Sequence, residues 1–445
     1  MNTSVGEFFE ALIIITVFLT IAYAVKSLFF QKLILPASLL AGIFALLFGP
    51  QVLGPVISKI PLIEGRVPEG LISDTSLAIW KQLPEYLITI VFACLFLGRK
   101  IPTVKEIVDK SLPNLAYGYT LALGQYMVGL LTAVLILKPF FDINILSGAL
   151  LAIGFQGGHG TVAGLQSTFN ELGFSEGTDL GLGIATIGII TAIMFGTLMS
   201  NLPFKKDGDD MHMSDDENNT IELKKTSFTL QVSLVGLSIV LGWLFLKSAG
   251  ILEDLLLSES NFRIIKYIPL FPVAMLAGLV LQKLAVKWRI DRQISRHHIS
   301  FISNLPLDIL IVAALGSLSL SAIANNIYPL LILAGTGIVY VLLVYFFLSK
   351  VFFGKYWRIK GLGELGQSMG TTAIGLILLK KTVANSDKML TAFSYKQPFY
   401  EPIVGGGLIT GLALPIIAQF GPWLFLTGIV IMWILVLFLA RVKKN

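Results

Sequence analysis

Two glycine-rich stretches inside apolar segments hold the residues of this sequence that are best placed to do chemistry. The first is GFQGGHGTVAG, residues 154–164, and the second is GLGELGQSMGTTAIG, residues 361–375. Glycine lets the backbone turn sharply and lets a ligand or another chain approach closely. An unpaired backbone group is costly in hydrocarbon, so such a break is tolerated where it lines a cavity rather than where it faces lipid. We therefore expect both stretches to line a binding site.

A broken helix is suited to binding small ions. Backbone amides at a helix start, together with the helix dipole, bind carboxylate or phosphate. Free carbonyls at the end of the preceding half-helix can coordinate sodium. His159 could gate transport by taking up a proton, but Met369 occupies the paired position in the second stretch. This comparison favours a structural role for the His159 imidazole. The predicted substrate-binding residues are Gln156, Gly157, Gly158, His159, Gly160, Thr161, Gln367, Ser368, Met369, Gly370, Thr371, Thr372 and Asp308.

Asp308 is the most isolated carboxylate within an apolar segment. An acid at membrane depth is a functional hypothesis by default, and Pro306 would free a backbone carbonyl nearby. These features predict a sodium site near Asp308, Asn304, Ser368 and Thr371. The alternative is a structural one, in which Asp308 is the interhelical partner of an amide or of a serine.

The composition indicates that a membrane positions these residues. The chain has 445 residues, of which 55% are hydrophobic and only 13% charged, and the mean hydropathy is +0.81. A soluble domain has roughly 25% charged residues, so we expect an all-α polytopic membrane protein. The net charge of +6 reflects basic residues at the ends of apolar segments. There they orient the protein in the bilayer rather than bind nucleic acid.

Eleven segments of about 20 apolar residues predict eleven full crossings. The two remaining apolar stretches, 143–168 and 361–380, contain the glycine-rich breaks and are predicted to be re-entrant hairpins. Most of the 33 lysines and arginines lie inside if the amino terminus is outside and the carboxyl terminus is cytoplasmic. The predicted crossings are 8–30, 33–53, 84–100, 112–137, 178–201, 227–249, 264–284, 299–321, 328–349, 400–420 and 422–441.

A hydrophilic insert divides the chain into two similar halves. Its composition, KKDGDDMHMSDDENNTIELKK, is typical of a solvated linker. We predict a first transmembrane repeat at 1–202, a cytoplasmic acidic linker at 203–226 and a second repeat at 227–421. An extra transmembrane segment at 422–445 then follows.

The two halves resemble each other at matching places. LPASLLAGI at 35–43 aligns with FPVAMLAGL at 271–279, and GGHGTVAG aligns with QSMGTTAIG so that Gly160 pairs with Gly370. Five crossings precede the linker, so the second repeat would enter the membrane from the opposite side. Inverted repeats with interrupted helices at matching positions indicate a secondary transporter.

The two motifs resemble those of the bacterial sodium/glutamate symporter family. The residues that carry the resemblance are GGHGT at 157–161 and GQSMGTT at 366–372. The resemblance implies inverted repeats, a homodimer and an elevator-like transport domain that contains both hairpins. It also implies sodium-driven uptake of glutamate, or a related small anionic amino acid, across a bacterial plasma membrane. Sodium is then the coupling ion, with no organic cofactor. The long linker and the extra segment depart from the family pattern, which leaves the substrate open.

Three other functions compete with this interpretation. The first is sodium-coupled dicarboxylate transport. Neither hairpin contains an arginine to bind a second carboxylate, so hairpin amides would have to bind it, and the choice between glutamate, another amino acid and a dicarboxylate stays open. The second is cation/proton antiport, which would need acids at the midplane in both halves, whereas Asp308 stands opposite Tyr86. The third is an intramembrane enzyme, but the four histidines form no metal-binding cluster and no third group orients a serine–histidine pair.

Overall fold

The computed structural model describes residues 4–29, 35–57, 72–202, 226–257, 263–382 and 387–442, and it is all-helical over these ranges. The predicted linker, 203–226, lies outside the described residues except for Thr226. The helices of the first half are α1 (Val5–Phe29), α2 (Ala37–Phe48), α3 (Gly54–Ile57), α4 (Asp74–Ala93), α5 (Val104–Lys110), α6 (Leu112–Thr132), α7 (Lys138–Phe141), α8 (Ser147–Ala163), α9 (Gln166–Glu171) and α10 (Gly177–Ser200).

The second half contains a similar order of elements. Its helices are α11 (Phe228–Leu256), α12 (Leu270–Lys287), α13 (Arg296–Gly316), α14 (Leu320–Asn325), α15 (Ile327–Leu343), α16 (Ser349–Phe353), α17 (Trp357–Met369), α18 (Thr372–Thr382), α19 (Asp387–Tyr400), α20 (Leu408–Phe420) and α21 (Pro422–Val442).

Seven helical stretches are long and apolar enough to cross a membrane, within the ranges given above. Three shorter apolar helices, α2, α20 and most of α21, accompany them. Large apolar side chains are exposed along α1, α11 and α21, as expected of surfaces that face lipid rather than water. The protein is therefore a multi-pass membrane protein. The seven stretches are Val5–Phe29, Leu112–Phe141, Gly177–Ser200, Phe228–Leu256, Leu270–Lys287, Arg296–Gly316 and Ile327–Met369.

Two predicted segments begin at the wrong residue. The segment predicted at 84–100 belongs to α4, which begins ten residues earlier because the Ser73 hydroxyl caps it, and which ends at Ala93. The lysine and the acids in its first turns hid this start from a count of apolar residues. The segment predicted to begin at 400 begins at Leu408, since residues 401–407 form a loop.

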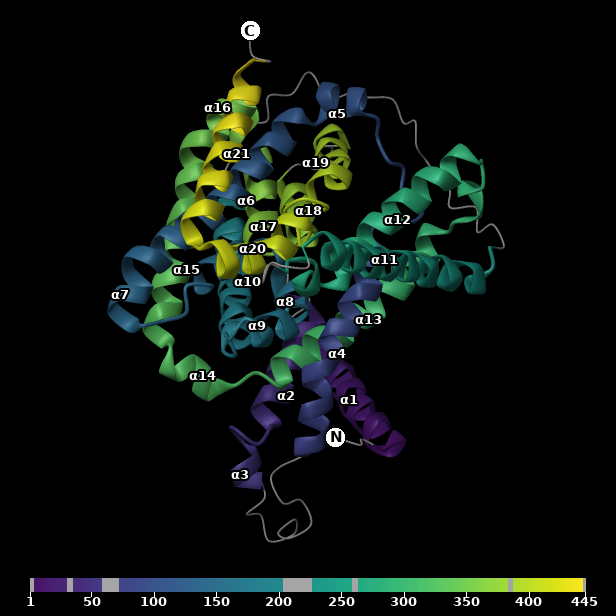
Figure 1. The fold of residues 1–445 in the computed structure, drawn as a ribbon, viewed down its shortest axis with the longest axis vertical. Coiled ribbons are helices and arrows are strands. Elements are labelled where there is room, and N and C mark those ends of the chain that lie inside the picture. The colour runs from purple at the N-terminus through teal and green to yellow at the C-terminus, as the bar shows by residue number, and fades with distance from the viewer. Residues whose placement is uncertain are drawn as a thin grey trace.

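The helices form two groups that share one large hydrophobic cluster, and the second group has two smaller clusters of its own. One group is a bundle in which α6 packs against α8 and α21, and α10 packs against α8 and α17. In the other group α4 packs against α13, with α2 on α13 and α12 on α4. Figure 1 shows α15, α16 and α21 along one side of the molecule and α11 and α12 on the opposite side. We call these groups the bundle and the flanking group.

Candidate functional site

The chain reverses within α8. Gly158 has φ 68° and ψ −171°, a left-handed backbone that favours glycine. A Cβ built on Gly181 would contact both Leu150 and Val162. Twelve residues of straight helix would separate these two side chains by about 18 Å, so the segment after Gly158 folds back. We call α8, with its turn at Gly158, hairpin 1.

The second glycine-rich stretch forms a hairpin of two antiparallel helices. α17 ends at Met369 and α18 begins at Thr372. A Cβ on Gly363 would lie 2.4 Å from Leu379, and one on Gly366 would lie 3.0 Å from the Cα of Gly375. Small residues therefore let the two backbones approach closely. We call α17 and α18 hairpin 2.

The tips of the two hairpins meet beside the middle of α10. A Cβ on Gly158 would lie 3.7 Å from the carbonyl oxygen of Gly370. A Cβ on Gly188, which lies midway along α10, would lie 2.5 Å from the carbonyl oxygen of Met369 and 2.8 Å from Phe155. The breaks at Gly158 and at Gly370 are thus adjacent in space.

Buried hydrogen bonds connect both tips to neighbouring helices. The Tyr400 hydroxyl donates to Gln156 Oε1 at 2.5 Å, and Gln125 Nε2 on α6 donates to the carbonyl oxygen of Ser368 at 2.9 Å. The Thr161 hydroxyl donates to the carbonyl oxygen of Gly157 at 2.9 Å. These bonds hold the tips in fixed positions and leave a polar interior between apolar walls.

A half-buried carboxylate lies at this junction, near Lys396 and Arg99 but in direct contact with neither. Glu401, directly after α19, accepts hydrogen bonds from Thr372 Oγ1 at 2.9 Å and from Gln367 Nε2 at 3.0 Å. Gln367 also donates to Gln397 at 2.9 Å. The ion pairs found among the described residues do not include Glu401. A half-buried carboxylate that makes no direct ion pair keeps an oxygen that can bind a cation.

A second carboxylate nearby already has such a partner. Glu364 on α17 forms an ion pair with Lys396 on α19, and both side chains are at most 1% exposed. Asn114 Nδ2 on α6 donates to the other oxygen of Glu364 at 2.9 Å. The pair therefore ties the first arm of hairpin 2 to two other helices. Because it is satisfied internally, it is a structural element rather than a free ion site.

The remaining predicted residues lie at the tips or on α13. His159 Nε2 lies 2.9 Å from Thr186 Oγ1 on α10. The Ser368 hydroxyl donates to the carbonyl oxygen of Leu365, and Thr371 Oγ1 accepts from the amide of Ile374. Gly157 and Gly160 flank the first turn.

The four residues of the predicted sodium site are not joined by hydrogen bonds in the described part of the chain. Asp308 accepts a hydrogen bond from the Tyr23 hydroxyl on α1 at 3.2 Å, and Asn304 is exposed on α13. Ser368 and Thr371 lie instead on hairpin 2. A sodium role for Asp308 stays a prediction. The contact with Tyr23 is interhelical, as in the alternative, but the partner is a tyrosine rather than an amide or a serine.

Sequence reasoning missed the contribution of α19. Lys396 and Tyr400 are four residues apart, and so are Gln397 and Glu401, so these two adjacent pairs form one polar side of the helix and its end. The signal was present in YKQPFYEP followed by GGG, since a polar face that ends in proline and glycines marks a third break. Glu401 was instead taken for an interfacial residue at the start of a crossing.

Comparison with known proteins agrees with this geometry. A search of curated proteins found no match. The family model described as sodium/glutamate symporter matches residues 69–386, which is more than two-thirds of the chain and includes both hairpins. The match confirms the resemblance seen in the two glycine-rich motifs. The chain therefore belongs to the sodium/glutamate symporter family and is a membrane transporter.

Proposed function

We propose that this protein couples the inward movement of sodium to the uptake of glutamate or a related small anionic amino acid. The observation that carries the proposal is the meeting of two interrupted segments, at Gly158 and Gly370, beside the Glu401 carboxylate, which makes no direct ion pair among the described residues. Interrupted helices that meet inside a membrane protein form the substrate and ion sites of secondary transporters. Family membership supports both sodium and glutamate.

The residues at the junction have complementary roles in this proposal. Glu401, with the Thr372 hydroxyl, supplies oxygen ligands for sodium, which prefers such hard donors. The amides at the start of α18, an eleven-residue helix, bind a carboxylate of the substrate. The amide groups of Gln156 and Gln367 add hydrogen bonds that fix its orientation.

Coupling follows from the charge at Glu401. Without sodium, this carboxylate repels an anionic substrate across a medium of low dielectric constant. Bound sodium neutralises it and adds a positive charge next to the substrate carboxylate. Substrate and sodium then bind with positive cooperativity, and by linkage each raises the affinity of the other by the same factor.

Matched contacts support two inverted repeats at 1–202 and 227–421. Gly42 on α2 approaches Leu315 on α13, whereas its aligned partner Gly278 on α12 approaches Ala93 on α4. The corresponding helices have thus exchanged partners, as a twofold pseudosymmetry requires. Each half also contains one π-helical turn, at Ala133–Leu137 and Val344–Leu348.

The two helix groups support an elevator mechanism. Both hairpins belong to the bundle, which would move as one body against the flanking group. Small residues lie where the groups meet. Gly160 of hairpin 1 is an example, since a Cβ at this position would lie 2.7 Å from Ile88 and 3.6 Å from Leu310. A seam of small and apolar side chains offers few specific contacts to break during sliding. The hairpins would be re-entrant from opposite leaflets in a homodimer of the bacterial plasma membrane, with the amino terminus outside.

The test is uptake into proteoliposomes loaded with the purified protein. Labelled glutamate, aspartate and glutarate are supplied with an inward sodium gradient, with a matched potassium gradient, and with a pH gradient alone. We expect sodium-driven accumulation of glutamate that exceeds that of glutarate. Accumulation of glutarate alone would indicate a dicarboxylate transporter, and accumulation driven by the pH gradient alone would contradict sodium coupling.

A further inference from the structure

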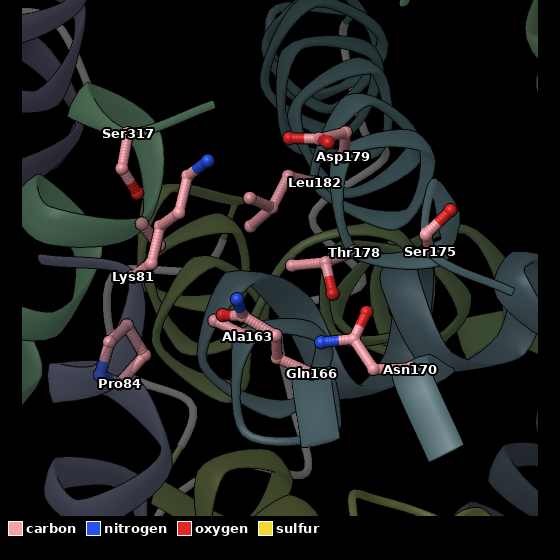
Figure 2. Close-up of a pocket in the computed structure, with 11 residues that line it drawn as sticks. Lys81, Pro84, Ala163, Gln166, Asn170, Ser175, Thr178, Asp179, Leu182 and Ser317 are labelled. Carbon is pink, nitrogen blue, oxygen red and sulfur yellow. The ribbon is translucent and has the colours of Figure 1, made fainter. Parts of the chain in front are cut away.

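A cavity that the site above does not use lies between the flanking group and the bundle. Its volume is about 220 Å³, and its walls come from α4 and α13 on one side and from α8, α9 and α10 on the other. Figure 2 shows the polar side chains that surround it. These include Lys81, Gln166, Asn170, Thr178, Asp179 and Ser317.

Opposite charges face each other across this cavity. In Figure 2 the Lys81 ammonium and the Asp179 carboxylate point toward the same space from different helices. They form no ion pair with each other, and the ion pairs found among the described residues include neither of them. One oxygen of Asp179 accepts from the backbone amide of Ser319 at 2.8 Å, after the end of α13. The second oxygen is open to another donor.

A third polar group in the wall is also unsatisfied. The hydroxyl of Thr178 is buried and has no hydrogen-bond partner. A buried hydroxyl that makes no hydrogen bond costs free energy, roughly 1–3 kcal/mol. The oxygen is covered by neighbouring atoms and in Figure 2 points away from the Asp179 carboxylate, so it belongs to the wall of the cavity.

The cavity lies beside the end of hairpin 1, where its lining residue Ala163 is five positions along the chain from the turn at Gly158. Ala163 ends hairpin 1, and Gln166 begins the short helix that follows. In the predicted orientation α4 and α10 both begin outside, so the cavity lies on the outer side of the junction. It is also bounded by both helix groups, so its shape changes whenever the bundle slides.

We propose that this cavity is an outer binding site for the zwitterionic head group of the transported amino acid, ahead of the hairpin tips. The inference rests on the proposed transport function. Lys81 pairs with a carboxylate of the substrate, and the open oxygen of Asp179 accepts from its ammonium. The side-chain amides of Gln166 and Asn170 hydrogen-bond the rest of the substrate.

Charge and size select this ligand class. A simple anion would be attracted by Lys81 but repelled by Asp179, whereas a simple cation would be attracted by Asp179 but repelled by Lys81. Only a ligand with both charges satisfies both side chains. The volume is below the approximately 300–1,000 Å³ of pockets for drug-sized molecules, which suits a metabolite the size of an amino acid.

The test measures transport from each side of the membrane in oriented vesicles. We expect Lys81→Gln and Asp179→Asn each to raise the KM for external glutamate about tenfold, with little change in kcat. The KM for internal glutamate should stay within twofold of wild type. Asp179→Asn should also narrow the preference for glutamate over glutarate, because glutarate lacks the ammonium group.

Two further variants separate a binding role from a structural one. Thr178→Val removes a covered hydroxyl that has no hydrogen-bond partner among the described residues, so it should fold normally and leave the external KM within twofold of wild type. Lys138→Gln and Asp142→Asn remove the same charges from an exposed ion pair on the same predicted side of the membrane. These controls should leave the external KM unchanged.

The outcomes distinguish this inference from the transport function itself. If wild-type vesicles show no sodium-driven glutamate uptake, the proposed function fails. If they do, but Lys81→Gln and Asp179→Asn leave the external KM within twofold, only the outer site is refuted. An equal rise in KM on both sides would likewise contradict an outer site, since it would indicate damage to the shared central junction.

Discussion

Replacing Gly188 by alanine would place a methyl group where the two hairpin tips meet α10. The added Cβ would lie 2.5 Å from the carbonyl oxygen of Met369 and 2.8 Å from Phe155, whereas ordinary contact begins at 3.4 Å. The tip of hairpin 2 must therefore retreat by about 0.9 Å. Overpacking of this kind costs about 1–3 kcal/mol. If that cost falls on the closed state of the junction, affinity falls roughly 5- to 150-fold.

The assay for Gly188→Ala is sodium-dependent glutamate uptake per mole of purified protein, with glutamate binding measured separately. We expect weaker glutamate binding at saturating sodium and slower uptake. The control is Gly335→Ala in α15, where an added Cβ meets no atom within 4 Å. Both glycines lie inside long helices, so the gain in helix propensity, about 1 kcal/mol, is common to both variants.

The result that refutes this reasoning is a Gly188→Ala protein that binds and transports glutamate within twofold of wild type. Thermal unfolding distinguishes a further case. If the Tm falls while the affinity of the remaining folded protein is unchanged, the strain falls on the whole bundle and the tips do not need close contact for binding.

Three other variants test the junction and its supports. Glu401→Gln should raise the sodium concentration for half-maximal glutamate uptake at least tenfold, which corresponds to about 1.4 kcal/mol or more. A titration of glutamate uptake with sodium measures this concentration. An unchanged titration would remove Glu401 from the ion site. Lys396→Met should lower the Tm markedly, because an unpaired Glu364 in the interior costs about 3–5 kcal/mol. The double variant Glu364→Leu/Lys396→Met should recover most of the lost Tm. Equal Tm values for the single and double variants would contradict a structural pair. Tyr400→Phe leaves Gln156 Oε1 without its donor, at a cost of about 1–3 kcal/mol. Thermal unfolding should therefore show a smaller loss of stability for Tyr400→Phe than for Lys396→Met. No loss of stability would mean that this hydrogen bond is not needed.

The helical fold and the two glycine-rich breaks could be predicted from the sequence for a simple physical reason. Long apolar runs must be helical in a membrane, because every backbone group must be paired. A break within such a run is therefore conspicuous. GGHGT and GQSMGTT were conspicuous in this sense, and the family match confirms the resemblance that they carried.

The polar face of α19 could not be found by the same method. Local hydropathy treats Lys396 and Glu401 as charges at the edge of a crossing, where they carry no information about depth. Only the packing of α19 against hairpin 2 shows that Lys396 is buried next to Glu364 and that Glu401 accepts from Thr372. Such contacts join residues about 30 positions apart, and no local pattern encodes their geometry.

Asp308 illustrates the opposite error of emphasis. An isolated acid in an apolar run draws attention because a buried charge is costly. The side chain lies instead within reach of the Tyr23 hydroxyl on α1. Isolation in the sequence therefore did not predict the place of this acid relative to the hairpin tips, which depends on how α13 packs.

The central claim is that two hairpins enter the membrane from opposite leaflets and meet around one substrate and its sodium ion. The most direct test labels single cysteines at Thr161 and Thr371 with a membrane-impermeant thiol reagent, in a Cys94→Ala background. We predict that Thr161→Cys reacts from the outside and Thr371→Cys from the cytoplasm, and that sodium with glutamate slows both reactions. Reaction of both cysteines from the same side only, or rates that sodium with glutamate leave unchanged, would contradict the account.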